Sequence, residues 1–272
     1  MSQLSLKIEF LMRIPPGSRS GLIIAYTATM GLDYEFISGS ERGHSRQSWL
    51  ESLYCFNNGS WFRPDRTGFG LLRMLNEHII APGCSSGFQP RDNMEIISIP
   101  LRGSMTYCDS IGNQEILKPG DIQLMSSGMG IFYSENNPDP HQPLHLLQIG
   151  LLPFRRNLPP AYEKISLESM HFRERFATIA CPEKKAGCIQ LRQKAWLMAG
   201  YFSKGRLNLP APAEKEIGTF LFMIHGKSRI FDRLLCTGDA VGIRGLLNTE
   251  SEILEPSLML LVHVPMKHRN AA

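Results

Sequence analysis

The chain has 272 residues, of which 43% are hydrophobic and 20% are charged, and its formal net charge is +4. This composition is ordinary for a globular protein, and the absence of any run of five like charges argues against direct nucleic-acid binding. No apolar stretch approaches eighteen residues, so we expect no transmembrane helix and no membrane partner. The six cysteines form no CxxC pair, which favours reduced thiols and a cytoplasmic location.

In the first half of the chain, glycines recur at even intervals. Gly103, Gly112, Gly120 and Gly128 lie eight or nine residues apart and separate short apolar stretches such as "DIQLM". Many short strands between closely spaced turns are typical of an all-β sandwich or barrel. The apolar stretch "LHLLQIGLL" (144–152) predicts a further buried strand.

The second half of the chain repeats this pattern loosely. "MIHGKSRIF" (223–231) is similar to "IPLRGSMTY" (99–107), and "CTGDAVGI" (236–243) is similar to "KPGDIQLM" (118–125). A repeat of this kind predicts two related β-barrels in tandem. The stretch "PFRRNLPPAYEK" (153–164), rich in proline and charge, is the natural linker between them.

Two further elements are expected after this linker. Ser166 is a good N-cap and predicts a short helix around 166–176, and "LMLLVHVP" (258–265) predicts a last core strand. We therefore predict an all-β fold of two antiparallel barrels with a few short helices. The first barrel would span residues 68–152 and the second residues 177–265.

Several separate stretches of the chain resemble the pirin family, whose members are bicupins. They are "SERGHSRQSWL" (40–50), "GFGLLRMLNEHIIAPG" (68–83), residues 94–135 and "LHLLQIGLLPFRRNLPPAYE" (144–163). The resemblance implies two tandem antiparallel cupin barrels, the N-terminal one in residues 37–165 and the C-terminal one in residues 166–272. Residues 1–36 lie outside the resemblance and are interpreted as an N-terminal extension that the barrels do not need for folding.

Metal-holding members of this family carry His-Pro-His before the first strand and His-Ser-Glu about forty residues later. Some are reported to oxidise quercetin, and others bind transcription regulators. In this sequence the first pattern falls on Gln89 and Arg91, and the second on Tyr133 and Glu135. A guanidinium has no free lone pair, and an amide, a neutral phenol and one carboxylate do not replace three imidazoles. We therefore expect no metal cofactor; the alternative is iron or another divalent transition metal.

A carboxylate left alone in a barrel mouth would be costly. We therefore predict an ion pair between Arg91 and Glu135 in place of the metal, with Gln89 and Tyr133 completing its hydrogen bonds. These four residues would line a binding pocket at the degenerate metal site. The competing interpretation is that Arg91 points into solvent from a loop.

Three cysteines are candidates for redox chemistry. Cys181 and Cys188 flank "PEKKAG", a predicted hairpin loop, and could form a disulfide if the strands place them opposite each other. Cys108 precedes a turn in a predicted strand and, if exposed, would be an oxidation-sensitive thiol. The alternative is that all six thiols are unreactive.

These observations favour a monomeric, metal-free, pirin-like bicupin with a non-catalytic binding or regulatory role. Its partner would be an unknown small molecule or protein. Two alternatives remain open. One is an oxygenase of the quercetin 2,3-dioxygenase type with a metal in the first barrel, and the other is a redox-responsive protein that acts through cysteine.

Overall fold

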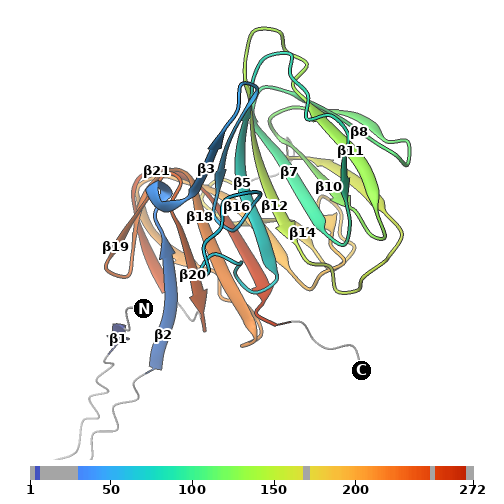
Figure 1. Ribbon diagram of the computed structural model, residues 1–272. Helices are drawn as coiled ribbons and strands as arrows, with labels where there is room; N and C mark the ends of the chain where they lie inside the picture. The colour runs from blue at the N-terminus through green and yellow to red at the C-terminus, as the bar shows by residue number, and fades with distance from the viewer. Residues whose placement is uncertain (1–3, 7–29, 168–171, 246–248, 268–272) are drawn as a thin grey trace, which may run out of the picture.

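The computed structural model describes residues 4–6, 30–167, 172–245 and 249–267. Strands dominate these residues (Figure 1), and the one helical element whose bounds lie within them is the 3-10 turn Gly39–Glu41. The predicted all-β fold is confirmed. In the same part of the chain, no helix has the length and apolar character needed to cross a membrane.

The N-terminal half contains two antiparallel sheets. The seven-stranded sheet has the order β13-β10-β7-β12-β5-β4-β3. Its strands are β3 (Gly43–Arg46), β4 (Leu50–Tyr54), β5 (Leu72–Ile80), β7 (Glu95–Arg102), β10 (Asp121–Ser126), β12 (Leu144–Leu151) and β13 (Ala161–Ser166). The four-stranded sheet, in the order β6-β11-β8-β9, is formed by β6 (Gln89–Arg91), β8 (Met105–Asp109), β9 (Gln114–Leu117) and β11 (Ile131–Asn136).

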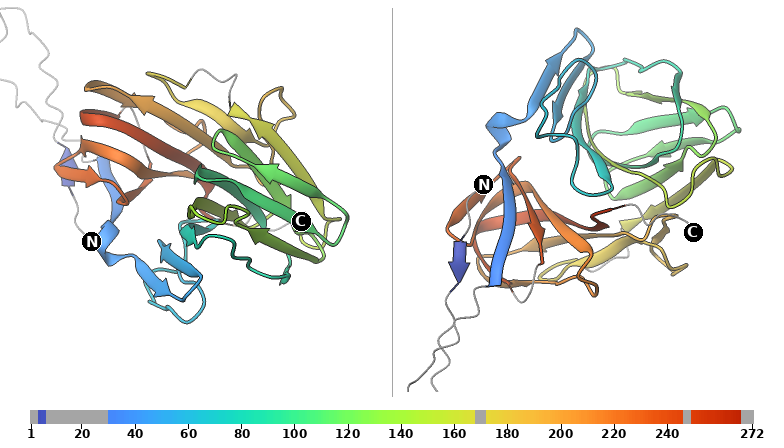
Figure 2. Two further views of the ribbon diagram at one scale, coloured as in Figure 1. Left: turned by 90° about the horizontal axis from the view of Figure 1, so that it is seen from above. Right: turned by 60° about the horizontal axis from the view of Figure 1, so that its bottom comes forward.

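The C-terminal half is a ten-stranded sheet whose main path runs β1-β2-β20-β18-β21-β16-β14-β15. Its strands are β1 (Leu4–Leu6), β2 (Met30–Ile37), β14 (Ala177–Cys181), β15 (Ile189–Gln190), β16 (Trp196–Phe202), β17 (Gly205–Leu209), β18 (Ile217–Ile230), β19 (Arg233–Cys236), β20 (Ala240–Arg244) and β21 (Thr249–Pro265). Strand β17 pairs with β21, and β19 pairs with β18. The two halves lie against each other, as Figure 2 shows from two sides.

Strand β2 begins in the segment that was expected to be a dispensable extension. It pairs antiparallel with β20, from Asp33 opposite Arg244 to Ile37 opposite Ala240. Figures 1 and 2 show it running along the C-terminal half of the molecule, although it comes first in the chain. The expectation that residues 1–36 are dispensable stays a prediction, and the pairing of β1 with β2 and of β2 with β20 argues against it. The resemblance could not place β2, because its partner strand lies some 200 residues further along the chain.

The segment around 153–176 also differs from the expectation. Residues 161–164 were assigned to a linker, but they belong to the edge strand β13, which pairs with β10. Ser166 is the last residue of that strand, and residue 167 has a 3-10 conformation. Residues 168–171 lie outside the described residues, and residues 172–176 are not helical.

The internal repeat is visible in two turns with the same hydrogen bonds. The Asp121 carboxylate accepts from the Lys118 backbone N–H at 3.0 Å, and the Asp239 carboxylate accepts from the Cys236 N–H at 2.8 Å. The glycine before each aspartate has a positive φ, 99° in the first turn and 84° in the second, a conformation that glycine adopts at little cost. The repeated Gly-Asp dipeptide therefore marks equivalent turns in the two halves.

The other proposed pair of turn glycines is not equivalent. Gly103 directly follows β7, which ends at Arg102, and its positive φ of 80° fits the predicted turn. Gly226 lies inside the long strand β18, where the pairing with β21 shifts register on both sides of it. A positive φ in a strand is typical of a β-bulge, so the glycine signal at this position indicates a bulge and not a turn.

The largest apolar core joins the two halves. It packs Ile97 and Leu147 of the N-terminal half together with Phe220 and Leu260 of the C-terminal half, all of them fully buried. One buried carboxylate also bridges the halves: Glu95 accepts hydrogen bonds from two consecutive backbone N–H groups of residues 192–193, at 2.7 and 2.9 Å. Burial raises the pKa of Glu95 to about 7.

Candidate ligand site in the N-terminal half

A small pocket opens between the two sheets of the N-terminal half. Strand β6 pairs with β11, which puts Gln89 opposite Tyr133 and Arg91 opposite Ile131. All four residues predicted for the degenerate metal site line this pocket: Gln89, Arg91, Tyr133 and Glu135. The cavity volume is about 160 Å³, which is below the ~300–1,000 Å³ of sites for drug-sized ligands.

The floor of the pocket is polar because of a row of cross-strand neighbours. Asn76 on β5 lies opposite Gln148 on β12, and Gln148 lies opposite Ser98 on β7. Residues directly opposite in an antiparallel pair point to the same face of the sheet. The row therefore carries amide and hydroxyl groups across the sheet.

Glu135 contacts this row from the facing sheet. Its carboxylate accepts hydrogen bonds from Gln148 Nε2 at 2.8 and 2.9 Å and from Ser98 Oγ at 3.0 Å. The residue is only 7% exposed, and burial raises its pKa to about 7, while the two hydrogen-bond partners and the charge of Arg91 lower it by less. Glu135 therefore changes its protonation state near neutral pH.

The predicted ion pair is not formed. Among the described residues, no nitrogen of Arg91 lies within 4.0 Å of a carboxylate oxygen of Glu135. The charge of Arg91 lowers the pKa of Glu135 without a direct ion pair, and it also lowers the pKa of Tyr133, which burial raises. Gln89 donates to the Ser86 backbone carbonyl at 3.3 Å instead of completing an ion pair. The prediction failed because it did not include Gln148 and Ser98, which occupy both carboxylate oxygens.

Sequence reasoning missed two further pocket residues on β5. Asn76 is 1% exposed, and neither atom of its side-chain amide has a hydrogen-bond partner. His78 Nδ1 bonds to Ser52 Oγ at 2.7 Å, and burial lowers the pKa of His78 to about 4, so the imidazole is neutral. The signal was present in the sequence: in "LRMLNEHII" Asn76 and His78 are two positions apart and therefore face the same side of the strand.

These side chains do not fit a transition metal. The described residues contain no group of three or more His, Cys, Asp or Glu side chains placed to hold an ion. Around the pocket the available donors are one carboxylate that already accepts three hydrogen bonds, amides, a phenol and one neutral imidazole. Arg91 brings a permanent positive charge to the same place. A transition-metal site needs several lone-pair donors and no cation among them.

The predicted redox cysteines lie in two places. Cys108 is half-buried, with its sulfur 3.0 Å from Ser134 Oγ. Cys181 and Cys188 are free thiols that lie together, with their sulfur atoms 2.7 Å apart. Burial, with a smaller effect of Cys181, raises the pKa of the Cys188 thiol to about 12.

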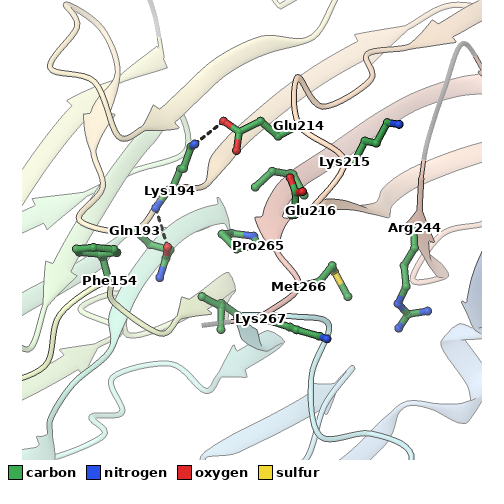
Figure 3. Close-up of a pocket in the computed structure, with 12 residues that line it drawn as sticks. Phe154, Gln193, Lys194, Glu214, Lys215, Glu216, Arg244, Pro265, Met266 and Lys267 are labelled. Carbon is green, nitrogen blue, oxygen red and sulfur yellow. Dashed lines mark hydrogen bonds and ion pairs between the residues drawn. The ribbon is translucent and has the colours of Figure 1, made fainter. Parts of the chain in front are cut away.

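A larger hollow of about 440 Å³ lies between the two halves (Figure 3). Leu71 comes from the N-terminal half and Met266 follows the last strand, β21. Some of the charged groups at its edge are paired: Lys194 with Glu214, as Figure 3 shows, and Arg244 of β20 with Asp33 and Glu35 of β2. None of its described lining residues has a buried polar atom without a partner, which distinguishes this hollow from the pocket around Arg91.

Comparisons with known proteins agree with the fold and the internal repeat. The pirin family profile matches residues 38–151, and the profile of the quercetinase C-terminal cupin domain matches residues 178–264. The pirin-like protein YhaK of Escherichia coli K12 is 32% identical over 236 residues, covering 82% of this chain and 96% of YhaK. The quercetin 2,3-dioxygenase of the same strain is 33% identical over 154 residues, covering 57% of this chain and 65% of that enzyme.

Solved structures show the same architecture. The crystal structure of YhhW from Escherichia coli superposes with a TM-score of 0.81 at 27% identity, covering 88% of this chain and 100% of YhhW. A second structure of YhhW, described as a bacterial pirin in complex with nickel(II), gives a TM-score of 0.80 at 27% identity and covers 86% of this chain and 99% of that one. The two cupin-type halves and these matches define a bicupin. The chain belongs to the pirin family.

Proposed function

We propose that this protein is a non-catalytic binding or regulatory member of the pirin family, monomeric and cytoplasmic, whose N-terminal pocket takes a small ligand without a transition metal. The observation that carries the proposal is the position of Arg91. It stands where the family pattern has a histidine, and it lines the pocket beside Glu135. A fixed positive charge at this position opposes a metal cation.

The hydrogen bonds of Glu135 support the same conclusion. Gln148 and Ser98 already donate to the carboxylate that would serve as the remaining ligand. Binding a metal through Glu135 would require these bonds to break, and no group of imidazoles nearby would compensate. The described residues therefore favour a pocket that recognises ligands by hydrogen bonds and charge.

Quercetin oxidation is the main alternative, because relatives of this chain carry that name. A dioxygenase of this type needs a metal with an open coordination position, and the donor set argues against one. The volume of about 160 Å³ is also small for burying a three-ring flavonol, given the ~300 Å³ at which sites for drug-sized molecules begin.

An oxygen-uptake assay with quercetin tests the proposal. The full chain is supplied with excess Fe(II) or Ni(II), and the rate is compared with that of the free metal ion. We expect no enzyme-dependent oxygen uptake. Saturable turnover that a chelator abolishes would show that the protein is a metal-dependent oxygenase.

A redox role is a second candidate, and the short distance between the sulfurs of Cys181 and Cys188 favours it. The raised pKa of Cys188 opposes it, because the thiolate is the reactive form. Mass spectrometry after treatment with hydrogen peroxide distinguishes a redox-active cysteine pair from two unreactive thiols. Loss of two hydrogens from the peptides that carry this pair would support a redox role, and unchanged thiols would exclude it.

A further inference from the structure

The pocket around Arg91 contains buried polar atoms that have no partner. Both amide atoms of Asn76 lack a hydrogen bond, and so does Nε of Arg91. Asn76 is 1% exposed and lines the cavity. Buried polar groups are nearly always satisfied in native proteins, by protein atoms or by ordered water. These groups therefore indicate an occupant that donates or accepts hydrogen bonds at the floor of the pocket.

The charge distribution indicates that this occupant is an anion. Arg91 is permanently protonated, and no described carboxylate lies within 4.0 Å of its guanidinium. The oxygens of Glu135 already accept hydrogen bonds from Gln148 and Ser98. His78, the imidazole in the same pocket, is neutral. Arg91 is thus a pocket cation without a direct counter-ion, and an anionic group on the ligand would supply one.

Size and lining narrow the ligand class further. A volume of about 160 Å³ equals roughly five water molecules at ~30 Å³ each, which leaves room for a few carbon atoms beside one anionic group. Met74 and Ile80 line the pocket together with Leu50 and Trp49, so part of the wall is apolar. One positive charge matches one negative charge, and the apolar part of the wall matches a ligand with a hydrocarbon part better than it matches inorganic phosphate.

We propose that this pocket binds a small organic monocarboxylate, whose carboxylate pairs with Arg91 and accepts an N–H of Asn76, while its hydrocarbon part lies against Met74 and Ile80. The inference rests on the proposed function, because a metal held by the same residues would occupy the same space. It adds the ligand class and assigns a role to Asn76, which the family pattern does not include.

Isothermal titration calorimetry on the full chain tests the proposal, in a buffer free of carboxylates at pH 6. The probes are sodium acetate, lactate and benzoate, with benzamide as the neutral counterpart of benzoate and inorganic phosphate as the alternative anion. We expect at least one carboxylate to bind with one-to-one stoichiometry. Benzamide and phosphate should bind at least tenfold more weakly than the best carboxylate.

Three variants assign the contacts. Arg91→Gln removes the positive charge from the pocket. Asn76→Asp keeps the shape of the side chain and adds a negative charge at the pocket floor. Each variant should weaken carboxylate binding at least tenfold. Arg206→Gln, an exposed arginine in the C-terminal half, is the matched control and should bind as the wild type does. Circular dichroism and the melting temperature establish that each variant is folded. If Asn76→Asp does not fold, Arg91→Gln alone decides.

Three results would overturn the inference: no binding of any carboxylate, equal binding of benzoate and benzamide, or unchanged affinity in Arg91→Gln. Preferred binding of phosphate would assign the pocket to a different anion. Failure here is separate from failure of the proposed function. A protein that binds no carboxylate and oxidises no quercetin refutes only this inference, whereas metal-dependent quercetin turnover refutes the proposed function itself.

Discussion

Replacing Asn76 by leucine should make the ligand-free protein more stable. The two side chains have the same number of non-hydrogen atoms, and Asn76 has two buried polar atoms without partners. Leaving a buried polar group unsatisfied costs about 1–3 kcal/mol, and exchanging it for an apolar group of similar shape removes that cost. For a chain of this size, ~1 kcal/mol corresponds to about 2–4 °C in melting temperature. We therefore expect the melting temperature to rise by about 2–10 °C.

Asn137 is the matched control for this experiment. It is also buried, at 2% exposed, but its amide donates to the backbone carbonyls of Ile80, Ala81 and Gln142 at 3.0, 3.1 and 2.8 Å. Asn137→Leu leaves these acceptors unpaired and should lower the free energy of unfolding by about 2–4 kcal/mol. Differential scanning calorimetry measures both variants.

The decisive result is that the two substitutions should change the stability in opposite directions. If Asn76→Leu destabilises the protein as much as Asn137→Leu does, Asn76 is already satisfied in the ligand-free state and does not wait for a ligand. A stabilised variant that no longer binds carboxylates would show that Asn76 is kept for function at a cost in stability.

Two further predictions concern protonation and the N-terminus. Because its pKa is raised from 4.5 to about 7, Glu135 binds more protons in the folded state, and its contribution to stability falls by up to about 3 kcal/mol between these values. His78 and His263, with pKa values lowered to about 4, change the stability in the opposite direction over a similar pH range. The quantity to measure is therefore the melting temperature of Glu135→Gln minus that of the wild type. This difference should increase from pH 4.5 to 7, and a constant difference would contradict the raised pKa of Glu135. Removal of residues 1–37, which takes β2 away from β20, should lower the melting temperature far more than removal of residues 1–29, and equal effects would show that β2 contributes nothing to folding.

Much of the fold could be predicted from local signals in the sequence. The turn glycines interrupt apolar stretches, and the Gly-Asp turns at Asp121 and Asp239 share their hydrogen bonds. Local signals failed where the structure depends on pairing with a strand that is distant in the sequence. β2 pairs with β20 across the length of the chain, and Gly226 forms a bulge only because β21 continues opposite it.

The candidate site was likewise predicted in part: its family positions were identified, but their hydrogen-bond partners were not. The family pattern brought Gln89, Arg91, Tyr133 and Glu135 to one pocket. It could not predict the partners of Glu135, because Gln148 comes from β12 and faces the pocket only through its pairing with β5 and β7. Two opposite charges at neighbouring positions suggested an ion pair, and the cross-strand amide formed the hydrogen bonds instead.

The measurement that tests the central claim most directly is the metal content of two proteins purified without chelators or nickel-affinity resin. One is the wild type, and the other is the triple variant Gln89→His, Arg91→His, Tyr133→His, which restores the histidines of the family pattern beside Glu135. After incubation with Fe(II) or Ni(II) and removal of the excess, mass spectrometry of the metals should find far less than one equivalent in the wild type and close to one equivalent in the triple variant. Near one equivalent in the wild type would contradict the account.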